Sequence, residues 1–513
     1  MIHKHIDKSQ IMKGRFRRTG FTIVELLIVI VVIAILAAIT IVSYNGIANR
    51  AKQSAAASAA EQAAKKVLNY STLNSEQYPS DLATAGVNND ANTIFEYTFD
   101  NTAKSYCITA TFQKVSYFVS NTNNNPTAGL CLGHTGGAPG PWSSLAVGDS
   151  FAHTCGITAG SAYCWGYNTN GQLGDGSTTN RNTPVAVSKS GVLSGKTVTA
   201  IAVGVSHTCA IASGAVYCWG YNSNGQLGNG STAQSTVPVA VDTTGVLSGK
   251  TITAVSAGSS STCAIASSAV YCWGSNTAGE LGNGTLTQST TPVAVNTSVM
   301  SGAVSAITVG KSACALSGGL VYCWGSDLYG RLGNGASQGD SNVPVAVDTS
   351  GVLSGKTVTA IATGDYHMTA LAGGQAYAWG YSPYGVGDGA GATQNQSPVA
   401  VLTSGVLAGK TIVSITGGGY STCAADSTGK TYCWGDGSHG HLGNDGTASS
   451  SVPVTVDVSG VLAGKVVSSL TSGVYHACGI ASGYIYCWGR GDWASLGNGT
   501  SVDVTAPVQV TSP

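Results

Sequence analysis

Residues 198–241 read "VTAIAVGVSHTCAIASGAVYCWGYNSNGQLGNGSTAQSTVPVAV", and the same frame returns along the chain every 51–55 residues. Each copy contains four runs with strand character: an alternating "VTAIAVG", then "HTCAI", "AVYCW" and, after a turn-rich loop, "PVAV". Seven copies fill residues 143–513, and their Trp-Gly pairs begin at Trp165, Trp219, Trp273, Trp324, Trp379, Trp434 and Trp488. Four strands per repeat and seven repeats predict an all-β, seven-bladed propeller, because radial closure avoids long exposed sheet edges.

The frame G…H-x-C-A…Y-C-W-G…G-x-L-G-x-G…P-V resembles the regulator of chromosome condensation repeat family. Members of that family form seven-bladed propellers, and a bacterial β-lactamase-inhibitor protein also uses them. The resemblance covers residues 143–513 and implies the same fold here.

The cysteines of the repeats fall at positions that face each other across a hairpin. In the second repeat, Ser-Gly at 213–214 forms a two-residue turn, and counting outward from it places Cys209 opposite Cys218. That pair is non-hydrogen-bonded, so its side chains approach closely enough for a disulfide. The fifth repeat replaces both members together, by Thr369 and Ala378, as pairing predicts. Zinc would need Cys-x₂₋₄-Cys spacings, which the sequence lacks.

The sixth repeat spaces its cysteines one residue wider. Its longer turn places Gly429 at a left-handed position, which keeps Cys423 and Cys433 opposed. The expected propeller disulfides are Cys155–Cys164, Cys209–Cys218, Cys263–Cys272, Cys314–Cys323, Cys423–Cys433 and Cys478–Cys487.

The N-terminus has a different character. Residues 21–44 form an apolar run of 24 residues, about 36 Å long as a helix, which is enough to span a bilayer. Six bases and one acid precede it in residues 1–20, so we expect its N-terminus in the cytoplasm. A secretory signal would have a shorter apolar core and an A-x-A-like cleavage site. Instead, an Ala-rich segment continues the predicted helix to residue 69.

One carboxylate, Glu25, lies inside the apolar run, in the sequence "GFTIVE". Together with the basic leader, this motif resembles the processing site of type IV prepilins. The resemblance implies that prepilin peptidase cuts between Gly20 and Phe21 and methylates the new amine. An intramembrane carboxylate is costly and needs a cationic partner. The α-amine of Phe21, in the same chain or in a neighbouring pilin subunit, is the natural partner of Glu25 and would fix the register of a fibre.

Residues 70–132 contain three strand-like runs, "IFEYTFD", "SYCITATF" and "VSYFVSN", and end in a loop. A long helix, a short sheet and a Cys-closed loop resemble the small α+β head of type IV pilins. This resemblance implies that Cys107 and Cys131 close the loop. Residues 133–142 are rich in Gly and Pro, which predicts a linker. All 14 cysteines are then paired, which indicates an oxidising compartment.

Charge excludes one class of partner. Charged residues are only 9% of the chain, and residues 21–513 hold 17 bases against 22 acids. A nucleic-acid partner would require a basic face, so none is expected.

Two loop positions vary between repeats while their flanks stay fixed, as expected of recognition loops on a rigid scaffold. The loop after Trp-Gly supplies the candidate ligand-binding residues Tyr167, Tyr221, Tyr329, Tyr381, Tyr384 and Trp493. A second variable edge precedes each hairpin, at Asp149, Lys311, Asp365, Tyr420 and Tyr475. In-register histidines recur at His153, His207, His367 and His476, and three repeats have Ser or no counterpart there, which favours a strand-packing role.

Short motifs add little. Arg490-Gly491-Asp492 spells an integrin-type tripeptide that arises easily by chance, and the sequons at Asn229, Asn283 and Asn498 follow from the repeat's Asn-Gly turns. No catalytic set, cofactor motif or metal spacing recurs, so we expect neither an enzyme nor a cofactor.

The sequence therefore predicts an N-terminal long α-helix with a small α+β pilin head, followed by the propeller. The leading hypothesis is a minor, tip-located type IV pilin that displays an adhesin. Its expected partners are prepilin peptidase, other pilin subunits and an extracellular glycan, protein or cell surface. The precursor would lie in the cytoplasmic membrane and the mature chain on an extracellular pilus. The alternatives are a secretion-system pseudopilin with a structural propeller, or a surface-tethered enzyme or enzyme inhibitor. Some members of the propeller family act as nucleotide exchange factors for a nuclear GTPase. This activity is not expected here, given the prepilin start and the lack of a basic face.

Overall fold

A computed structural model gives the fold of the chain. It describes residues 50–89, 92–101, 104–112, 115–121, 123–128, 141–148, 153–336, 339–381, 385–390, 394–511 and 513. The chain divides into two units, residues 1–137 and 138–513. The predicted processing and assembly residues, Gly20, Phe21 and Glu25, lie outside the described residues.

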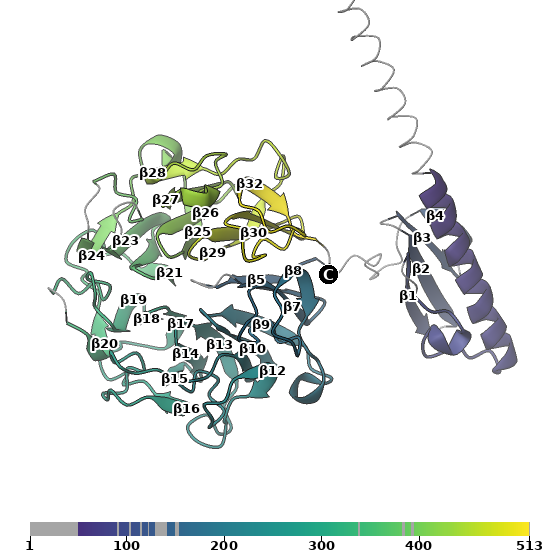
Figure 1. Cartoon of the computed structure of the whole chain (residues 1–513), viewed down its shortest axis with the longest axis horizontal. Helices are drawn as coiled ribbons and strands as arrows, with labels where there is room; N and C mark the ends of the chain where they lie inside the picture. Colours follow the sequence, from purple (N-terminus) through teal and green to yellow (C-terminus); the bar gives the residue numbers. More distant parts are fainter. Residues whose placement is uncertain are drawn as a thin grey trace, which may run out of the picture. The chain divides into compact units, whose positions relative to one another are not determined.

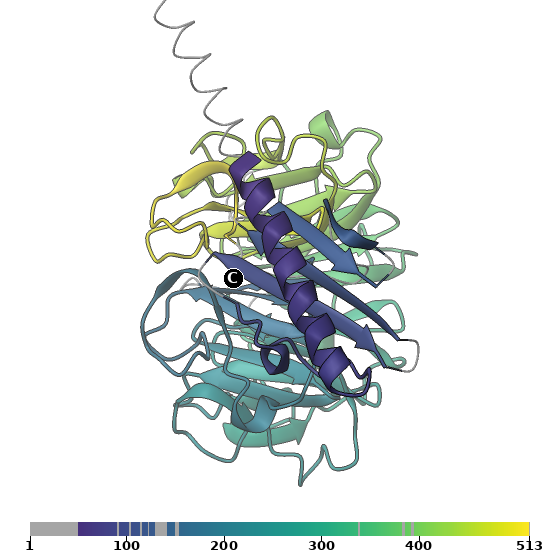
Figure 2. The ribbon, with the colours of Figure 1, turned by 90° about the vertical axis from the view of Figure 1, so that its right-hand side faces the viewer.

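The first unit is a helix packed on a four-stranded sheet. The helix covers residues 50–73, a short 3-10 turn η1 follows at Ala83–Ala85, and the antiparallel sheet has the order β1-β2-β3-β4. The helix lies across one face of the sheet (Figure 2), where its small residues Ala60, Ala63 and Val67 pack against Ile108 and Val119. The strands are β1 (Thr93–Asp100), β2 (Ser105–Phe112), β3 (Val115–Ser120) and β4 (Asn123–Ala128).

Strand β4 differs from the sequence prediction, which placed a loop there. It pairs with β3 at the edge of the sheet, where Pro126 is tolerated because an edge strand needs only one row of backbone hydrogen bonds. Within the described residues, no helix has both the length and the apolar character required to cross a membrane.

The second unit consists of seven consecutive four-stranded antiparallel sheets, the blades, arranged around an axis (Figure 1). Blade 1 contains β5 (Ser144–Val147), β6 (His153–Thr158), β7 (Ser161–Gly166) and β8 (Arg181–Ala186). Blade 2 contains β9 (Val198–Val203), β10 (His207–Ala212), β11 (Ala215–Gly220) and β12 (Ser235–Ala240). Blade 3 contains β13 (Ile252–Ala257), β14 (Ser261–Ala266), β15 (Ala269–Gly274) and β16 (Ser289–Ala294). Blade 4 contains β17 (Val304–Val309), β18 (Ser312–Ser317), β19 (Leu320–Gly325) and β20 (Ser341–Ala346).

The remaining blades follow the same order. Blade 5 contains β21 (Val358–Thr363), β22 (His367–Ala372), β23 (Gln375–Tyr381) and β24 (Gln394–Ala400). Blade 6 contains β25 (Ile412–Gly417), β26 (Ser421–Asp426), β27 (Thr431–Gly435) and β28 (Ser450–Thr455). Blade 7 contains β29 (Val467–Ser472), β30 (His476–Ala481), β31 (Tyr484–Gly489) and β32 (Val504–Gln509). Three short 3-10 turns lie in the connections: η2 (Gly191–Leu193), η3 (Gly405–Leu407) and η4 (Ser438–Gly440).

The first strand of every blade lines the axis. A cavity of about 240 Å³ lies there, bounded by aliphatic and hydroxyl side chains such as Val203, Thr308 and Thr363. The connections between first and second strands and between third and fourth strands emerge at one end of the propeller, which we call the loop face. The hairpin turns and the connections between blades emerge at the other end, which we call the hairpin face. The chain enters the propeller at the hairpin face through Trp142, whose backbone N–H bonds the Gly483 carbonyl.

Six of the seven expected disulfides are present in the described residues. They join the second and third strands of six blades, at Cys155–Cys164, Cys209–Cys218, Cys263–Cys272, Cys314–Cys323, Cys423–Cys433 and Cys478–Cys487. In blade 5, Thr369 and Ala378 face each other at the same register. Cys107 is also disulfide-bonded, and its expected partner Cys131 lies outside the described residues.

A repeated contact joins each blade to the next. Trp273 of blade 3 donates its indole N–H to the Gln226 carbonyl of blade 2 at 2.9 Å. Gly228 lies directly against that indole: a Cβ there would approach Trp273 Nε1 to 2.6 Å, and its φ is +67°. The same contact recurs at all seven joints, including the one that closes the ring, where Trp165 of blade 1 bonds Ser495 of blade 7 and lies on Gly497. Glycine is needed there because of both the space and the left-handed backbone.

Candidate functional site

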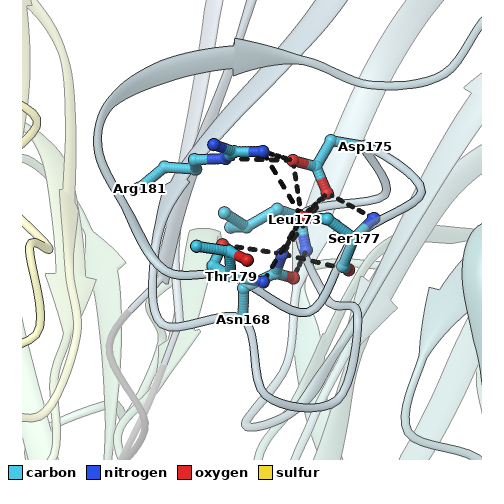
Figure 3. Close-up of polar contacts among 6 residues, drawn as sticks. All are labelled: Asn168, Leu173, Asp175, Ser177, Thr179 and Arg181. Atoms are coloured by element: carbon cyan, nitrogen blue, oxygen red, sulfur yellow. Dashed lines mark hydrogen bonds and ion pairs between the residues drawn. The ribbon is translucent and has the colours of Figure 1, made fainter.

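In blades 1 to 3, one buried Asn side chain holds the backbone of the loop after Trp-Gly. In blade 1, Asn168 Oδ1 accepts the Leu173 N–H at 2.9 Å, and Asn168 Nδ2 donates to the carbonyls of Ser177 and Thr179 at 3.2 and 3.0 Å (Figure 3). Asn222 and Asn276 make the same contacts in blades 2 and 3. These loops therefore present their outer residues from a fixed backbone.

The same loop contains a turn capped by an Asx side chain. Asp175 Oδ1 accepts the Ser177 N–H at 2.9 Å, and its carboxylate also pairs with Arg181 at 2.9 Å (Figure 3). Asn229, Asn283 and Asn498 occupy this capping position in their repeats and accept the N–H two residues on. The sequons thus coincide with a structural turn.

The in-register histidines connect neighbouring blades. His207 Nε2 lies 2.9 Å from Thr262 Oγ1 of the next blade, and the Thr262 hydroxyl donates to the Gln226 carbonyl at 2.9 Å. Since that hydroxyl gives its proton to the carbonyl, it accepts one from His207 Nε2. The same bond joins His153 to Thr208, His367 to Thr422 and His476 to Thr154.

The histidine and the threonine are lost together. Where a blade has Ser in place of His, the following blade has Ala or Met in place of Thr; these pairs are Ser261 with Ala313, Ser312 with Met368, and Ser421 with Ala477. Burial lowers the pKa of His207 and His367 to about 4 and that of His476 to about 3. These three histidines are therefore neutral packing groups at neutral pH, in line with the strand-packing interpretation.

Aromatic side chains gather on the loop face over blades 4 to 6. Tyr329 and Tyr381 approach to 4.4 Å between ring centroids, and Tyr366 and Tyr420 stack at 4.7 Å. Tyr366 lies 6.1 Å from Tyr381, which joins the two pairs. We call these four residues the tyrosine cluster. Lys311 Nζ lies over the Tyr366 ring, 4.2 Å from its centroid. All five side chains are half-buried.

A buried arginine joins two of the loops that carry the tyrosine cluster. Arg331, only 2% exposed, donates from Nη1 to the Asp365 carbonyl at 2.8 Å and from Nη2 to Ser326 Oγ at 2.9 Å. It therefore ties the loop that carries Tyr329 to the loop that carries Tyr366. A hydrogen bond from Tyr420 lowers the pKa of Tyr366, and Lys311 acts in the same direction against the opposing effect of burial.

A second group lies on the same face over blades 7 and 1. The Arg490 guanidinium lies 4.4 Å from the Trp493 ring and 5.0 Å from the Tyr475 ring, and Tyr167 contacts Trp493 at 6.0 Å. We call these four residues the arginine cluster. Arg490 also pairs with Asp492 at 2.6 Å, so the two charged side chains of the integrin-type tripeptide bind each other.

The structure brings four of the six predicted ligand-binding residues into these clusters: Tyr167, Tyr329, Tyr381 and Trp493. Tyr221 is 37% exposed and makes no ring contact with any described residue. Tyr384 and Asp149 lie outside the described residues. Sequence comparison missed Tyr366. Tyr366 directly precedes the in-register His367, just as Tyr420 and Tyr475 directly precede Ser421 and His476. Aligning the repeats on that position would have selected Tyr366 in place of its neighbour Asp365.

The two sets of connections carry opposite charge. Among the described residues, the connections that emerge at the loop face, with the strand ends beside them, hold ten carboxylates and four cations (Arg181, Lys311, Arg331 and Arg490), a net charge of −6. The connections between third and fourth strands are long and extend away from this face, so that Asp445 lines one pocket with Asp457. The hairpin face has seven lysines against four aspartates, a net charge of +3. Its lysines are Lys189, Lys196, Lys250, Lys356, Lys410, Lys430 and Lys465. Among the described residues, no group of three or more His, Cys, Asp or Glu is placed to hold a metal.

Models of known protein families match both the propeller and the N-terminal segment of the chain. The model of the RCC1-like domain matches residues 193–513, the regulator of chromosome condensation (RCC1) repeat matches 159–211, and the prokaryotic N-terminal methylation motif matches 15–41. The last match contains Gly20, Phe21 and Glu25.

Several known proteins resemble the propeller. The ultraviolet-B receptor UVR8 of Arabidopsis thaliana is 29% identical over 61% of this chain and 70% of its own length. The human ubiquitin ligase HERC2 is 29% identical over 68% of this chain, but the match spans only 7% of HERC2. Among solved structures, human WBSCR16 superposes with a TM-score of 0.60 at 21% identity, over 69% of this chain and 94% of that one. Yeast Prp20 gives 0.58 at 22% identity, over 68% and 85%. The chain belongs to the RCC1-like domain family and carries a prokaryotic N-terminal methylation motif at its start.

Proposed function

We propose that this chain is a type IV pilin-like subunit that displays its propeller outside the cell as a binding domain. The proposal rests on the loop face, where two aromatic clusters lie on a disulfide-linked scaffold. This scaffold follows an N-terminal methylation motif in the sequence. Partly exposed aromatic and arginine side chains on the loops of a folded scaffold are typical recognition surfaces. The binding surface would be the loop face, because the chain enters the propeller at the hairpin face.

In this proposal the precursor waits in the cytoplasmic membrane until prepilin peptidase cuts after Gly20. The Phe21 amine and Glu25 then direct packing among other pilin subunits. A propeller of this size on every subunit would crowd a helical fibre, which favours a minor, tip-located position. The propeller then acts as an adhesin for a cell surface, glycan or protein.

The test uses the intact chain in cells that lack their own copy. Wild type should restore the chain to the sheared-pilus fraction in low amount and should restore adhesion. A Tyr366→Ala/Tyr381→Ala variant should reach the pilus fraction but lose most adhesion. Tyr221→Ala is the matched control, because it removes an isolated tyrosine from the same face.

Three outcomes would contradict the proposal. The chain could be the dominant pilus subunit, or it could be absent from pili. It could also be required for protein secretion and not for adhesion, which would identify a pseudopilin. Enzyme activity or inhibition without surface binding would favour a tethered enzyme or inhibitor.

A further inference from the structure

We propose that the tyrosine cluster and the acidic loop face around it form a docking surface for an arginine- or lysine-rich segment of a protein partner. This inference rests on the proposed function and names the class of its ligand. Three observations support it: a cation already held by the cluster, the charge of the face, and the state of the arginines on that face.

The first observation is Lys311. Its ammonium group lies 4.2 Å from the Tyr366 centroid, while Tyr420 stacks on Tyr366 and Tyr381 lies edge-on to it. A ring face attracts cations through its quadrupole. The cluster is therefore a cation site that the chain fills with its own lysine. A guanidinium or ammonium group from a partner would compete with Lys311 for the same ring.

The second observation is the surrounding field. Three carboxylates on loop-face connections of blades 3, 4 and 6 make no ion pair with any described residue: Glu280, Asp340 and Asp436. Asp340 is exposed, and Glu280 and Asp436 are half-buried. A face of one sign attracts partners of opposite sign and speeds their association. Because these carboxylates are distributed over three blades, a chain segment with several positive charges fits better than a single small amine.

The third observation concerns the positive groups that would attract an anionic ligand. Seven of the propeller's eight lysines lie on the hairpin face, away from the cluster. The arginines of the loop face are engaged: Arg181 pairs with Asp175, Arg490 pairs with Asp492, and Arg331 is buried. An acidic glycan would therefore meet a net negative surface.

The experiment measures binding of a fluorescein-labelled octa-arginine peptide to the intact mature chain in detergent micelles. An octa-glutamate peptide serves as the charge-reversed control. We expect the arginine peptide to bind, with an affinity that falls as salt rises. Lys311→Ala should tighten binding about threefold, because it vacates the Tyr366 ring. Tyr366→Leu should weaken binding about threefold for the same reason.

Lys356→Ala is the matched control. Lys356 also lies over a tyrosine ring, 4.9 Å from the Tyr377 centroid, but on the hairpin face. It changes the net charge by the same amount as Lys311→Ala and should leave the affinity unchanged. Asp340→Asn, at an exposed position, removes the charge but keeps the Oδ1 that accepts the Asp327 N–H, and it should weaken binding.

The inference is overturned if octa-arginine binds no better than octa-glutamate. It is also overturned if the two lysine variants change the affinity equally, or if a neutral glycan binds at the cluster with an affinity that Lys311→Ala leaves unchanged. In that last case the proposed binding function stands and only the ligand class is wrong. Absence of the chain from the cell surface would refute the proposed function instead.

Discussion

The buried histidines predict that mild acid destabilises the propeller. His207, His367, His441 and His476 are fully buried and neutral, with pKa values of about 4, 4, 4 and 3, because desolvation opposes their protonated form. In the unfolded chain each would titrate near 6.5. The unfolded state therefore binds more protons between these values, and stability must fall as the pH falls.

The magnitude follows from linkage. Above pH 6.5 the four histidines are neutral in both states and contribute no pH dependence. Below it, each lowers the free energy of unfolding by up to about 1.4 kcal/mol per pH unit. At pH 5.0 the loss is about 2 kcal/mol per histidine and about 8 kcal/mol for all four. That loss is comparable with the whole stability of a typical domain.

Other titrating groups change the stability at lower pH or in the opposite direction. Hydrogen bonds to turn residues lower the pKa of Asp242, Asp348 and Asp457 below 3.8, so their stabilisation is lost only at still lower pH. Asp327 has a pKa raised by burial and therefore acts in the opposite direction, as a single group. The decline between pH 6.5 and 5 consequently reports mainly on the histidines.

The assay is urea unfolding followed by tryptophan fluorescence, from pH 7.5 to 5.0, on the mature chain in detergent. The matched variant is His207→Ser/Thr262→Ala, which copies the Ser and Ala that the chain itself uses at Ser261 and Ala313. At pH 7.5 we expect it to be less stable than wild type by about 2–3 kcal/mol, because a buried hydrogen bond and packing are lost. At pH 5.0 this deficit should shrink by about 2 kcal/mol, since one titrating group is gone. A deficit that is independent of pH, or a wild-type stability that is flat over this range, would refute the reasoning.

Three further predictions concern the frame and the processing site. Gly228→Ala should lower the free energy of unfolding by about 2–4 kcal/mol, because its Cβ would meet Trp273 at a left-handed backbone position. Gly245→Ala, with open space around it, should change the free energy of unfolding by less than about 1 kcal/mol. Urea unfolding of both variants measures the difference, and equal effects would contradict the prediction. Cys209→Ala/Cys218→Ala should cost at most about 3 kcal/mol and leave the fold intact, because the closed loop is short and blade 5 forms without a disulfide; circular dichroism and the melting temperature measure it, and global unfolding would refute it. N-terminal mass spectrometry of the mature chain should find a methylated Phe21, and detection of only the full leader would argue against processing there.

The hairpin registers were predictable from the sequence because a short turn fixes them. Counting from the turn at 213–214 gives Cys209 opposite Cys218, as the structure has it. The wider sixth turn holds Gly429 at φ +81°, which keeps Cys423 opposite Cys433. Local turn chemistry decides such pairings without any tertiary contact.

Features that depend on neighbouring blades were not predicted. The His–Thr bond joins residues 55 positions apart, so comparing the repeats one position at a time hides it. Pairing each repeat's His with the next repeat's Thr reveals it. The tyrosine cluster likewise combines two loop families from three blades, and no single repeat contains it. Strand β4 was missed because its Asn- and Pro-rich sequence has low strand propensity, which the edge position tolerates.

The joint that closes the ring has a consequence for how the chain can be rebuilt. Blades 7 and 1 meet through the same indole–carbonyl bond and the same glycine contact as every other pair of neighbours, and no strand is exchanged between blades. The start of β5 and the end of β32 both lie at the hairpin face, where all the connections between blades run. Circular permutants that link those two ends and reopen the ring at another blade junction should assemble the same propeller. By the same logic, recombination between repeats can exchange whole blades, so the recognition loops can be replaced one sector at a time while the joints stay unchanged.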